Sequence, residues 1–244
     1  MSDTIEGRNA VLEALKAALP LSAVLIGDSS PSDKVLDEIV REARALDVDV
    51  QRVPRQELDK ASVRGAHQGV VARMAPFTFA ELGEVVTACA EKRRALIVAL
   101  DGVTDPQNLG AIARTVEVAG GDGLLITKRR SAGVGPASFK ASAGALAHLP
   151  VMRETNLVRS LERFKNEGFW VVGAAHQASE SFWDADLPDK MVLVMGSEGS
   201  GLSRLTREAC DLSVSVPVHG RTESLNVGQA TTAIVYEWLR RKGA

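Results

Sequence analysis

Short continuous runs of valine, isoleucine and leucine recur along the second half of the chain, and helical patterns separate most of them. Strands that are apolar throughout are buried on both faces, which is typical of a parallel sheet covered by helices. The second half is therefore expected to form an α/β domain with a parallel sheet. The strand-like runs lie at 95–103, 123–128, 169–176, 190–197 and 212–218, and the helical patterns at 106–119, 136–146, 156–167 and 223–242.

The first part of the chain repeats this alternation on a smaller scale. Strand-like runs at 21–27, 48–53 and 69–74 alternate with helical patterns at 6–19 and 32–46. Pro76 then breaks the pattern, and a helical segment that ends in Glu91-Lys92-Arg93-Arg94 follows, as is typical of a linker. We expect three parts, namely a small α/β domain over 1–75, a linker helix over 76–92 and a larger domain over 93–244.

Composition narrows the function classes. Hydrophobic residues make up 45% of the chain and charged residues 25%, which is ordinary for a globular protein. A net charge of −2 argues against nonspecific coating of nucleic acid, although basic clusters such as Lys128-Arg129-Arg130 leave an RNA partner open. The N-terminal residues lack the features of a signal peptide, the apolar runs are too short for a bilayer, and Cys89 and Cys210 show no metal or redox spacing. A cytoplasmic protein without membrane or metal is expected.

The first polar loop of the larger domain precedes a helix. Asp105 can cap that helix and Pro106 can occupy its first position. Asn108 and Arg114 lie off its apolar stripe. Taken singly, Asn108 is more simply a residue of the helix start and Arg114 a solvated helix side chain.

The second loop follows the run at 190–197 and reads GSEGSGLS. Gly196, Gly199 and Gly201 allow the backbone to approach another group closely or to turn with positive φ. The loop is not a phosphate-binding P-loop, because it lacks the GK[ST] ending, and it is not a nucleophile elbow, because it lacks the G-x-S-x-G order. Glu198 stands in the middle of this loop. The simpler interpretation is an exposed loop carboxylate. The alternative is a carboxylate that faces a glycine-lined pocket and binds an amine, hydroxyl or arginine there.

The third loop, HGRTESLNVGQATT, leads from a strand-like run into the last helix. One capping residue satisfies a helix start, but here Ser224 and Asn226 stand together around Leu225. A strand that feeds a polar loop into a helix N-terminus is also a common place for a ligand site in α/β proteins. The polar residues of each loop alone have a structural explanation. All of them together, in three loops that follow three strands, are hard to explain as chance.

Together these loops resemble the three motifs of the SPOUT superfamily of RNA methyltransferases, and specifically the TrmH/RlmB branch that methylates ribose 2′-oxygens. Asn108 and Arg114 match the Asn and Arg of the first motif, Glu198 the Glu of the second, and Ser224 and Asn226 the Ser and Asn of the third. IEGRNAVLEAL and GAHQGVVAR are similar to the ends of the small ribosomal-protein-like domain that precedes the catalytic domain in the RlmB subgroup. NVGQA departs from the usual NVSVA at Gly228.

The resemblance implies a deep trefoil knot that holds S-adenosylmethionine in a bent conformation, largely through backbone groups. It implies a catalytic role for Ser224 beside the polar residues of the other motifs. It also implies that Arg114 binds the neighbouring phosphate and that Asn108 and Glu198 hold Arg114 and the ribose in place, without a metal. The residues that it places around the cofactor are Gly196, Val216, Leu225, Gly199, Gly201 and Asn226.

The expected function is thus 2′-O-methylation of RNA with S-adenosylmethionine, most directly on a guanosine of 23S rRNA. The alternatives are a tRNA guanosine methyltransferase, an rRNA adenosine methyltransferase of the thiostrepton-resistance type, and, in a different class, a non-catalytic RNA-binding protein. An enzyme with another nucleotide cofactor is disfavoured because the glycine fingerprint for dinucleotides is missing. The resemblance also implies a twofold homodimer through the last helix and the first-motif helix, with Arg114 near the cofactor pocket of the partner.

Overall fold

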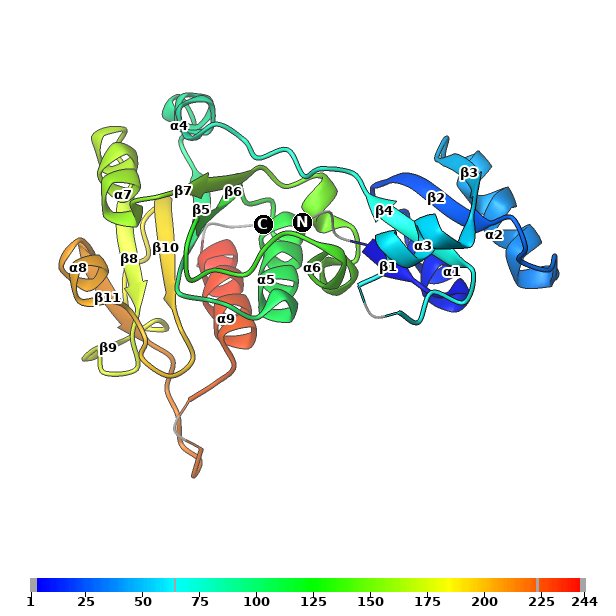
Figure 1. Ribbon diagram of the computed structural model, residues 1–244. Coiled ribbons are helices and arrows are strands. Elements are labelled where there is room, and N and C mark those ends of the chain that lie inside the picture. The colour runs from blue at the N-terminus through cyan, green and yellow to red at the C-terminus, as the bar shows by residue number, and fades with distance from the viewer. Residues whose placement is uncertain (1–3, 64, 223, 242–244) are drawn as a thin grey trace.

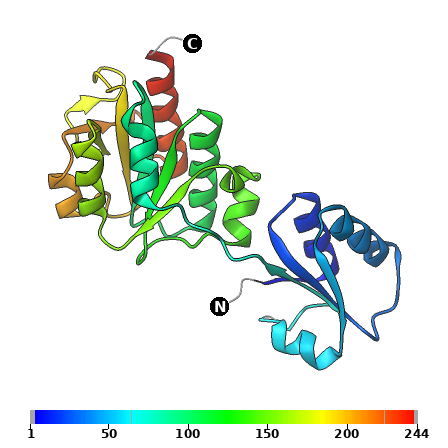
Figure 2. The same ribbon diagram turned by 90° about the horizontal axis from the view of Figure 1, so that it is seen from above.

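The computed structural model describes residues 4–63, 65–222 and 224–241, which fold into two lobes joined by one extended segment (Figure 1, Figure 2). Each lobe is built around its own sheet. Glu223 and Lys242, at the ends of the helical pattern expected over 223–242, lie outside the described residues, as do residues 1–3 and 243–244 of the two expected domains.

The N-terminal lobe holds a mixed four-stranded sheet in the order β1-β4-β2-β3. Strand β2 pairs parallel with β3 and antiparallel with β4, and β4 also pairs antiparallel with β1. Its elements are β1 (Thr4–Glu6), α1 (Arg8–Lys16), β2 (Leu21–Gly27), α2 (Lys34–Ala45), β3 (Asp49–Val53), α3 (Arg55–Ala61) and β4 (Val70–Met74).

Alternation along β2 explains why helices cover both faces of this sheet. Val24 and Ile26 belong to the same hydrophobic cluster as the apolar side chains of α1 and α2. Leu25 points to the opposite face, where it joins a smaller cluster with Val53 and with Leu58 of α3. Because successive side chains of a strand alternate between faces, one buried strand stabilises both layers.

The helix in the connection between the lobes is shorter than the sequence indicates. Residues 75–81 are extended, and the backbone N–H of Ala80 donates to Val151 O at 2.8 Å. Helix α4 covers only Leu82–Ala90, and its buried side chains pack on the second sheet. The segment expected as a linker helix over 76–92 therefore consists of an extended strap followed by a helix that lies on the larger lobe.

The C-terminal lobe holds seven strands in the order β7-β6-β5-β10-β8-β11-β9, and neighbouring strands of this sheet pair in parallel. The fold class expected from the sequence is thus confirmed. Its further elements are β5 (Ala95–Asp101), α5 (Pro106–Val118), β6 (Gly123–Thr127), α6 (Pro136–Ser142), the 3-10 helix η1 (Ala145–Ala147), β7 (Val151–Glu154), α7 (Leu157–Asn166), β8 (Trp170–Ala174), β9 (Glu180–Ser181), β10 (Lys190–Gly196), α8 (Arg204–Glu208), β11 (Leu212–Ser215) and α9 (Val227–Arg241).

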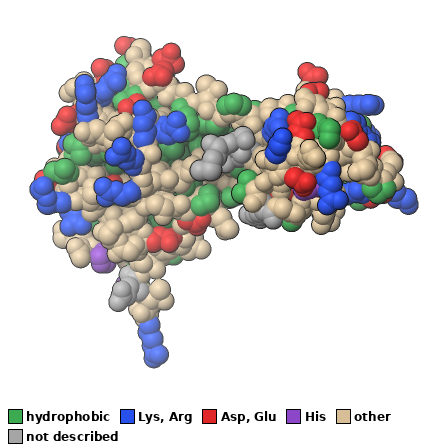
Figure 3. All heavy atoms as spheres, viewed as in Figure 1, with side chains coloured by type: hydrophobic (Ala, Val, Ile, Leu, Met, Phe, Trp, Pro, Cys, Tyr) green, Lys and Arg blue, Asp and Glu red, His purple; other side chains and the backbone are tan. Residues whose placement is uncertain are grey.

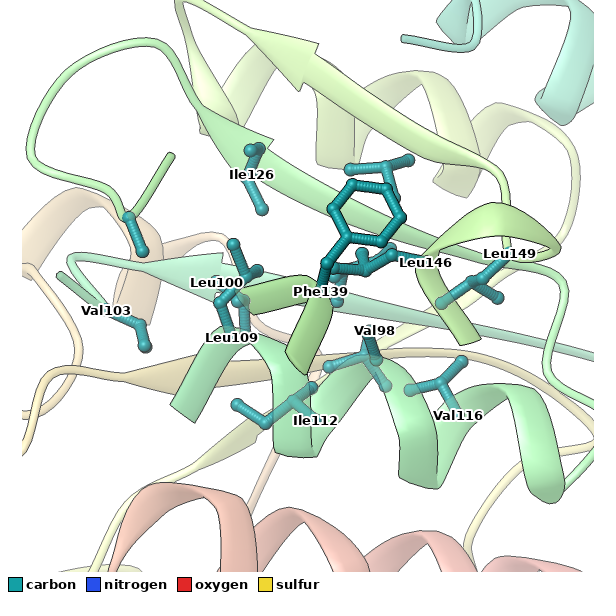
Figure 4. Close-up of a cluster of buried hydrophobic side chains, with 14 of the residues drawn as sticks. Val98, Leu100, Val103, Leu109, Ile112, Val116, Ile126, Phe139, Leu146 and Leu149 are labelled. Carbon is teal, nitrogen blue, oxygen red and sulfur yellow. The ribbon is translucent and has the colours of Figure 1, made fainter. Parts of the chain in front are cut away.

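The two faces of this sheet have separate cores. On one face, Val98 and Leu100 of β5 pack with Leu109 and Ile112 of α5 and with Phe139 of α6 (Figure 4). On the other face, alternate residues of the same strands pack against α4 and α7. A sheet that is buried on both sides fixes the ends of its strands, and hence the loops that leave them.

Helix α9 returns to the first of these faces. The chain leaves β11 near one edge of the sheet, passes the loop 197–203 and comes back to lie beside α5 near the centre of the sheet (Figure 1). Thr115 and Thr232 join the two helices by a hydroxyl hydrogen bond of 2.8 Å. This return carries the third polar loop to the first two, and the expected knot stays a prediction.

Candidate functional site

The site lies at the carboxyl ends of β5 and β10, which are neighbours in the sheet. Asp101 and Gly196 stand side by side in the parallel register, so the loops that follow them emerge at the same edge. The Asp101 carboxylate also accepts a hydrogen bond of 2.8 Å from the backbone N–H of Ser203, which ties the second loop to the end of β5. Ligands of open α/β sheets bind at this edge.

Three polar side chains meet here in a closed cluster, one from the start of α5, one from the loop after β10 and one from the residue before α9. The Asn108 amide donates to Glu198 Oε1 at 2.9 Å. The Asn226 amide donates to the same Oε1 at 2.8 Å and to Asn108 Oδ1 at 2.9 Å. Each of the three therefore contacts both others, and two amide donors converge on one carboxylate oxygen, as charge-assisted hydrogen bonds favour.

Asn226 also caps helix α9. Its Oδ1 accepts from the backbone N–H of Gly228 at 2.9 Å and of Gln229 at 3.4 Å. These are the second and third residues of the helix, the positions that an N-cap side chain satisfies. The structure shows the cap, because the oxygen accepts from the first turn of the helix, while the nitrogen donates within the cluster. That Asn226 belongs to a ligand site stays a prediction.

The glycines of the second loop differ in why they are needed. A Cβ on Gly196 would lie 2.2 Å from the carbonyl carbon of Gly201, so only glycine fits there. Gly201 has φ of +64° and closes a short backbone bridge with Ser197 through hydrogen bonds of 3.0 and 3.1 Å. A Cβ on Gly199 would meet nothing within 4 Å, so the fold of the free protein does not require glycine at that position.

Gly228 is packed where the start of α9 approaches α5. A Cβ there would lie 3.2 Å from Asn226 Oδ1 and 3.5 Å from the Cβ of Ala111. A larger residue would press on the oxygen that caps the helix. With glycine in place of the usual serine at this position, no Cβ crowds the Asn226 oxygen that caps the helix or the Ala111 side chain of α5.

A cavity of about 290 Å³ opens beside the cluster and is walled by the Gly-rich loop, the end of β8 and residues of the segments 214–218 and 224–230. Its volume is near the lower end of the roughly 300–1,000 Å³ that is usual for small-molecule sites. Five of the six residues expected around a cofactor line it, together with Ser224; the five are Gly196, Val216, Leu225, Gly199 and Gly201. The sixth, Asn226, is directed to the hydrogen-bonded cluster instead.

A second cavity of about 200 Å³ adjoins the first. It is lined by the loop after β5, including Asp105 and Asn108, and it shares Ser197, Glu198 and Gly199 with the larger cavity. Within the described part of the chain, Glu198 is the one ionisable residue that lines both cavities. The cluster therefore stands at the boundary between two spaces, which is where a group would pass from one bound molecule to another.

Arg114 is not part of this cluster. It is exposed on α5, roughly 9 Å along the helix from Asn108 at 1.5 Å per residue, and it lines neither cavity. It shares the exposed face of that helix with Ala111 and with Val118, which is 61% exposed. The structure thus brings Asn108, Glu198 and Asn226 together and leaves Arg114 beside them on an open face.

Sequence reasoning missed several residues of the larger cavity. His176 and Gln177 follow β8, and Arg207 lies on α8. The position of β8 next to β10 brings the first two to the site, and that order cannot be read from the sequence. The run FWVVGAAH that ends at His176 was a usable signal, since polar residues directly after a buried strand are candidates in a parallel sheet.

The thiols near this lobe are unsuited to nucleophilic work. Burial raises the pKa of the Cys210 thiol to about 11. Burial also raises the pKa of Cys89 above its ordinary value. Both remain protonated near neutral pH, and the thiolate is the reactive form of cysteine.

Within residues 4–63, 65–222 and 224–241, no three His, Cys, Asp or Glu side chains gather in a way that could hold a metal ion. None of the helices in the described part of the chain is both long and apolar enough to span a bilayer.

Family comparison decides the class of the larger lobe. Residues 95–236 match the model of the SpoU rRNA Methylase family, and residues 4–80 match a model described as RNA 2′-O ribose methyltransferase substrate binding. The chain belongs to the SpoU methylase family. The SpoU domain contains both cavities and the whole hydrogen-bonded cluster, while the substrate-binding domain corresponds to the N-terminal lobe.

Individual SpoU relatives support this assignment. An uncharacterized tRNA/rRNA methyltransferase of Mycobacterium ulcerans is 41% identical over 241 residues, which are 99% of this chain and 78% of that protein. The SpoU methyltransferase AviRb from Streptomyces viridochromogenes, solved in complex with AdoMet, superposes with a TM-score of 0.70 at 26% identity, over 98% of this chain and 89% of AviRb. A solved RNA 2′-O ribose methyltransferase superposes with a TM-score of 0.65 at 26% identity, over 98% of this chain and 88% of its own.

Proposed function

We propose that this SpoU protein methylates the ribose 2′-oxygen of a guanosine in 23S rRNA, with S-adenosylmethionine as the methyl donor. The observation that carries the proposal is the cluster of Asn108, Glu198 and Asn226 at the boundary of two adjoining cavities. A methyl transferase needs one space for the donor and one for the acceptor, with fixed polar groups between them.

The larger cavity fits the donor. Apolar side chains such as Val216 and Leu225 can cover the adenine ring, and the turn at Gly201 exposes backbone groups to its edge. The AdoMet complex of AviRb, which shares this fold at 26% identity, supports the assignment. S-adenosylmethionine, when bound, supplies an electrophilic methyl group.

The smaller cavity receives the ribose in this proposal. Asn108 and Glu198 line it, and their mutual hydrogen bond fixes both side chains before the substrate arrives. Preorganised polar groups of this kind orient a weak nucleophile such as a ribose hydroxyl and stabilise the charge that develops on its oxygen. Ser224, at the rim of the larger cavity, would contact the donor side of the same boundary.

Arg114 has a different task, which its position supports. Its exposed guanidinium lines neither cavity, so it is free to bind a phosphate of the RNA next to the methylated ribose. An arginine stays charged at all physiological pH values, and this favours phosphate binding and oxyanion stabilisation over a role as a base.

Arg114→Ala tests this assignment. We expect methyl transfer to fall by at least about 100-fold, while calorimetric affinity for S-adenosylmethionine stays within about twofold. Arg159→Ala on α7 is the matched control, since Arg159 is also an exposed helical arginine and lies away from both cavities. Near-normal turnover of the Arg114 variant would remove the arginine from the mechanism.

The choice of a large-subunit rRNA guanosine rests on the N-terminal lobe and on the resemblance of its ends to the RlmB subgroup. Mapping of 2′-O-methyl groups in RNA from cells with and without the gene tests it. The proposal expects one guanosine of 23S rRNA to lose its methyl group. Loss at a tRNA guanosine or an rRNA adenosine would keep the reaction and replace the substrate.

We further propose a twofold homodimer through α5 and α9. The exposed face of α5 carries Arg114 and Val118, and the neighbouring α9 exposes Tyr236 to 45%. A second copy on this face would place Arg114 close to the partner's cavity. Sedimentation at working concentration should show a dimer, and an active monomer would contradict the shared site.

A further inference from the structure

The charges around the larger cavity are few and unevenly placed. Among its lining residues, the ionisable ones are His176, Glu198 and Arg207. Glu198 marks the end that adjoins the smaller cavity, because it lines both. Arg207 lines only the larger cavity, and among the residues that the structure describes it is the one arginine or lysine that does so.

Arg207 is held with most of its hydrogen-bonding capacity unused. Its Nη2 donates to Leu202 O at 3.3 Å, which directs the side chain back along the Gly-rich loop. It forms no ion pair with any carboxylate in the described part of the chain. Arg204, on the same short helix, is instead paired with Glu208 at 2.6 Å. A guanidinium has five N–H donors, so Arg207 retains several for a ligand.

The charge pattern of the donor molecule matches this arrangement. S-adenosylmethionine carries a positive sulfonium, which must face the acceptor, and a carboxylate at the end of its methionyl chain. The acceptor side of the cavity is the Glu198 side, since Glu198 borders the smaller cavity. The carboxylate, which stands beside the α-ammonium group at the far end of the ligand, therefore needs a donor elsewhere on the wall, and Arg207 is the arginine on the described part of that wall.

We propose that Arg207 binds the methionyl carboxylate of S-adenosylmethionine and thereby fixes the chain of the donor along the Gly-rich loop. This inference rests on the proposed cofactor. The contact is a guanidinium–carboxylate pair, which accommodates two parallel N–H···O bonds and which an ammonium cannot reproduce in the same geometry. Arg207 is a binding residue in this scheme and takes no part in proton transfer.

Decarboxylated S-adenosylmethionine is the decisive probe, because it lacks only the carboxylate. Calorimetric titration of the full chain should show that the wild type binds S-adenosylmethionine about tenfold or more tightly than the decarboxylated compound. In Arg207→Gln this preference should fall to about twofold or less, with affinity for the decarboxylated compound not reduced. Arg204→Gln is the matched control and should keep the wild-type preference, because Arg204 lines neither cavity.

Two further measurements keep the result unambiguous. Arg207→Lys should show an intermediate preference, because it keeps the charge and loses the planar fork. Binding of the decarboxylated compound by each variant shows that the cavity is intact.

The contradicting outcomes are distinct for the two proposals. If the wild type and Arg207→Gln show the same preference, or if His176→Gln abolishes it while Arg207→Gln does not, Arg207 is not the carboxylate partner. If the wild type binds neither compound, the proposed cofactor fails as well.

Discussion

The side-chain amide of Asn226 both caps helix α9 and holds the polar cluster together. Its oxygen accepts from the first turn of α9, and its nitrogen donates to Asn108 and Glu198. A single side chain thus connects the start of the last helix to the polar cluster between the cavities. The position of the cluster depends on the helix, and the helix start depends on the same residue.

The two tasks can be separated by substitution. Serine caps helices about as well as asparagine but is too short to reach both partners, whereas alanine does neither. We expect Asn226→Ala to lower the free energy of unfolding by about 1 kcal/mol and Asn226→Ser by clearly less. Both should lower methyl transfer by about 100-fold or more, because Asn108 and Glu198 lose their common partner. Urea denaturation and a methyl-transfer assay measure the two effects.

Equal loss of stability in both variants would mean that the oxygen is not an effective cap. Full activity in Asn226→Ser would mean that the cluster is not needed for catalysis.

The Gly-rich loop offers a second test at the level of single residues. Gly196→Ala should lower the free energy of unfolding by about 1–3 kcal/mol, because the new Cβ overlaps the backbone of Gly201. Gly199→Ala should leave it unchanged, since its Cβ meets open space. Thermal denaturation compares the two variants, and a drop in cofactor affinity without a drop in stability at Gly199 would assign that glycine to ligand contact. Unchanged stability in Gly196→Ala would contradict the packing argument.

Individual site residues were predictable where they follow long parallel strands. Glu198 lies in the loop directly after β10, and Asn108 lies in the first turn of α5, the helix that follows β5. Strand ends of a parallel sheet meet at one edge, which brings the two together. Arg207 was not predictable, because α8 is only five residues long. His176 was a candidate from its place directly after a buried strand, but only the strand order, with β8 beside β10, brings it to the site. The cofactor contacts of the predicted residues remain predictions.

Helix α9 is fixed at its far end by charge as well as by packing. Arg94 lies over the ring of Trp238 at 3.8 Å and donates to the backbone oxygen of that residue at 2.8 Å. Glu237 accepts from Arg240 at 2.9 Å and from Arg241 at 2.6 Å, and these hydrogen bonds hold the pKa of its carboxyl at about 2. Cations at a helix C-terminus also offset its dipole.

The Glu237 contacts predict a pH-dependent contribution of α9 to stability. Because the pKa of Glu237 is lowered in the folded state, the stabilisation is present above the ordinary carboxyl pKa of 4.5 and is lost as the pH falls towards about 2. Glu237→Gln should therefore lower the melting temperature at pH 6–7 and change it progressively less between pH 5 and pH 2. Calorimetry of both proteins across that range measures the difference. A difference that does not depend on pH would contradict the charge argument.

Elements with long apolar runs matched their expected positions, and short ones were missed. The expected strand at 190–197 is β10, and the expected helix at 106–119 is α5. Strands β1 and β9 have three and two residues, so pairing with a neighbouring strand defines them and no periodicity can reveal them. The packing of helix α4 could not be predicted either. Its sequence pattern indicates a helix but does not indicate the sheet on which that helix packs.

At the scale of the whole molecule, basic side chains are spread over both lobes (Figure 3). The exposed cluster Lys128, Arg129 and Arg130 follows β6, at the same edge of the sheet as the cavities, and forms no ion pair with described residues. Free cations at the rim of the site suit an RNA backbone.

Replacement of these three residues by alanine should weaken RNA binding and reduce its dependence on salt. Each lost phosphate contact lowers the slope of log K against log salt by about 0.7 for single strands, so the slope should fall by up to about 2. Fluorescence anisotropy with labelled rRNA fragments at several salt concentrations measures it. Affinity for S-adenosylmethionine should stay the same in the variant, and an unchanged slope would place the RNA path elsewhere.

The polar cluster joins parts of the chain that are far apart in sequence. Asn108 is 90 residues from Glu198 and 118 residues from Asn226. Synthesis proceeds from the N-terminus, so the substrate-binding lobe and the first two motifs leave the ribosome before the third. A nascent chain that has not yet extended past Asn226 can carry RNA-binding surface but lacks the closed cluster. The polar cluster can therefore close only after Asn226 has left the ribosome, although the N-terminal lobe and the first two motifs are synthesised well before it.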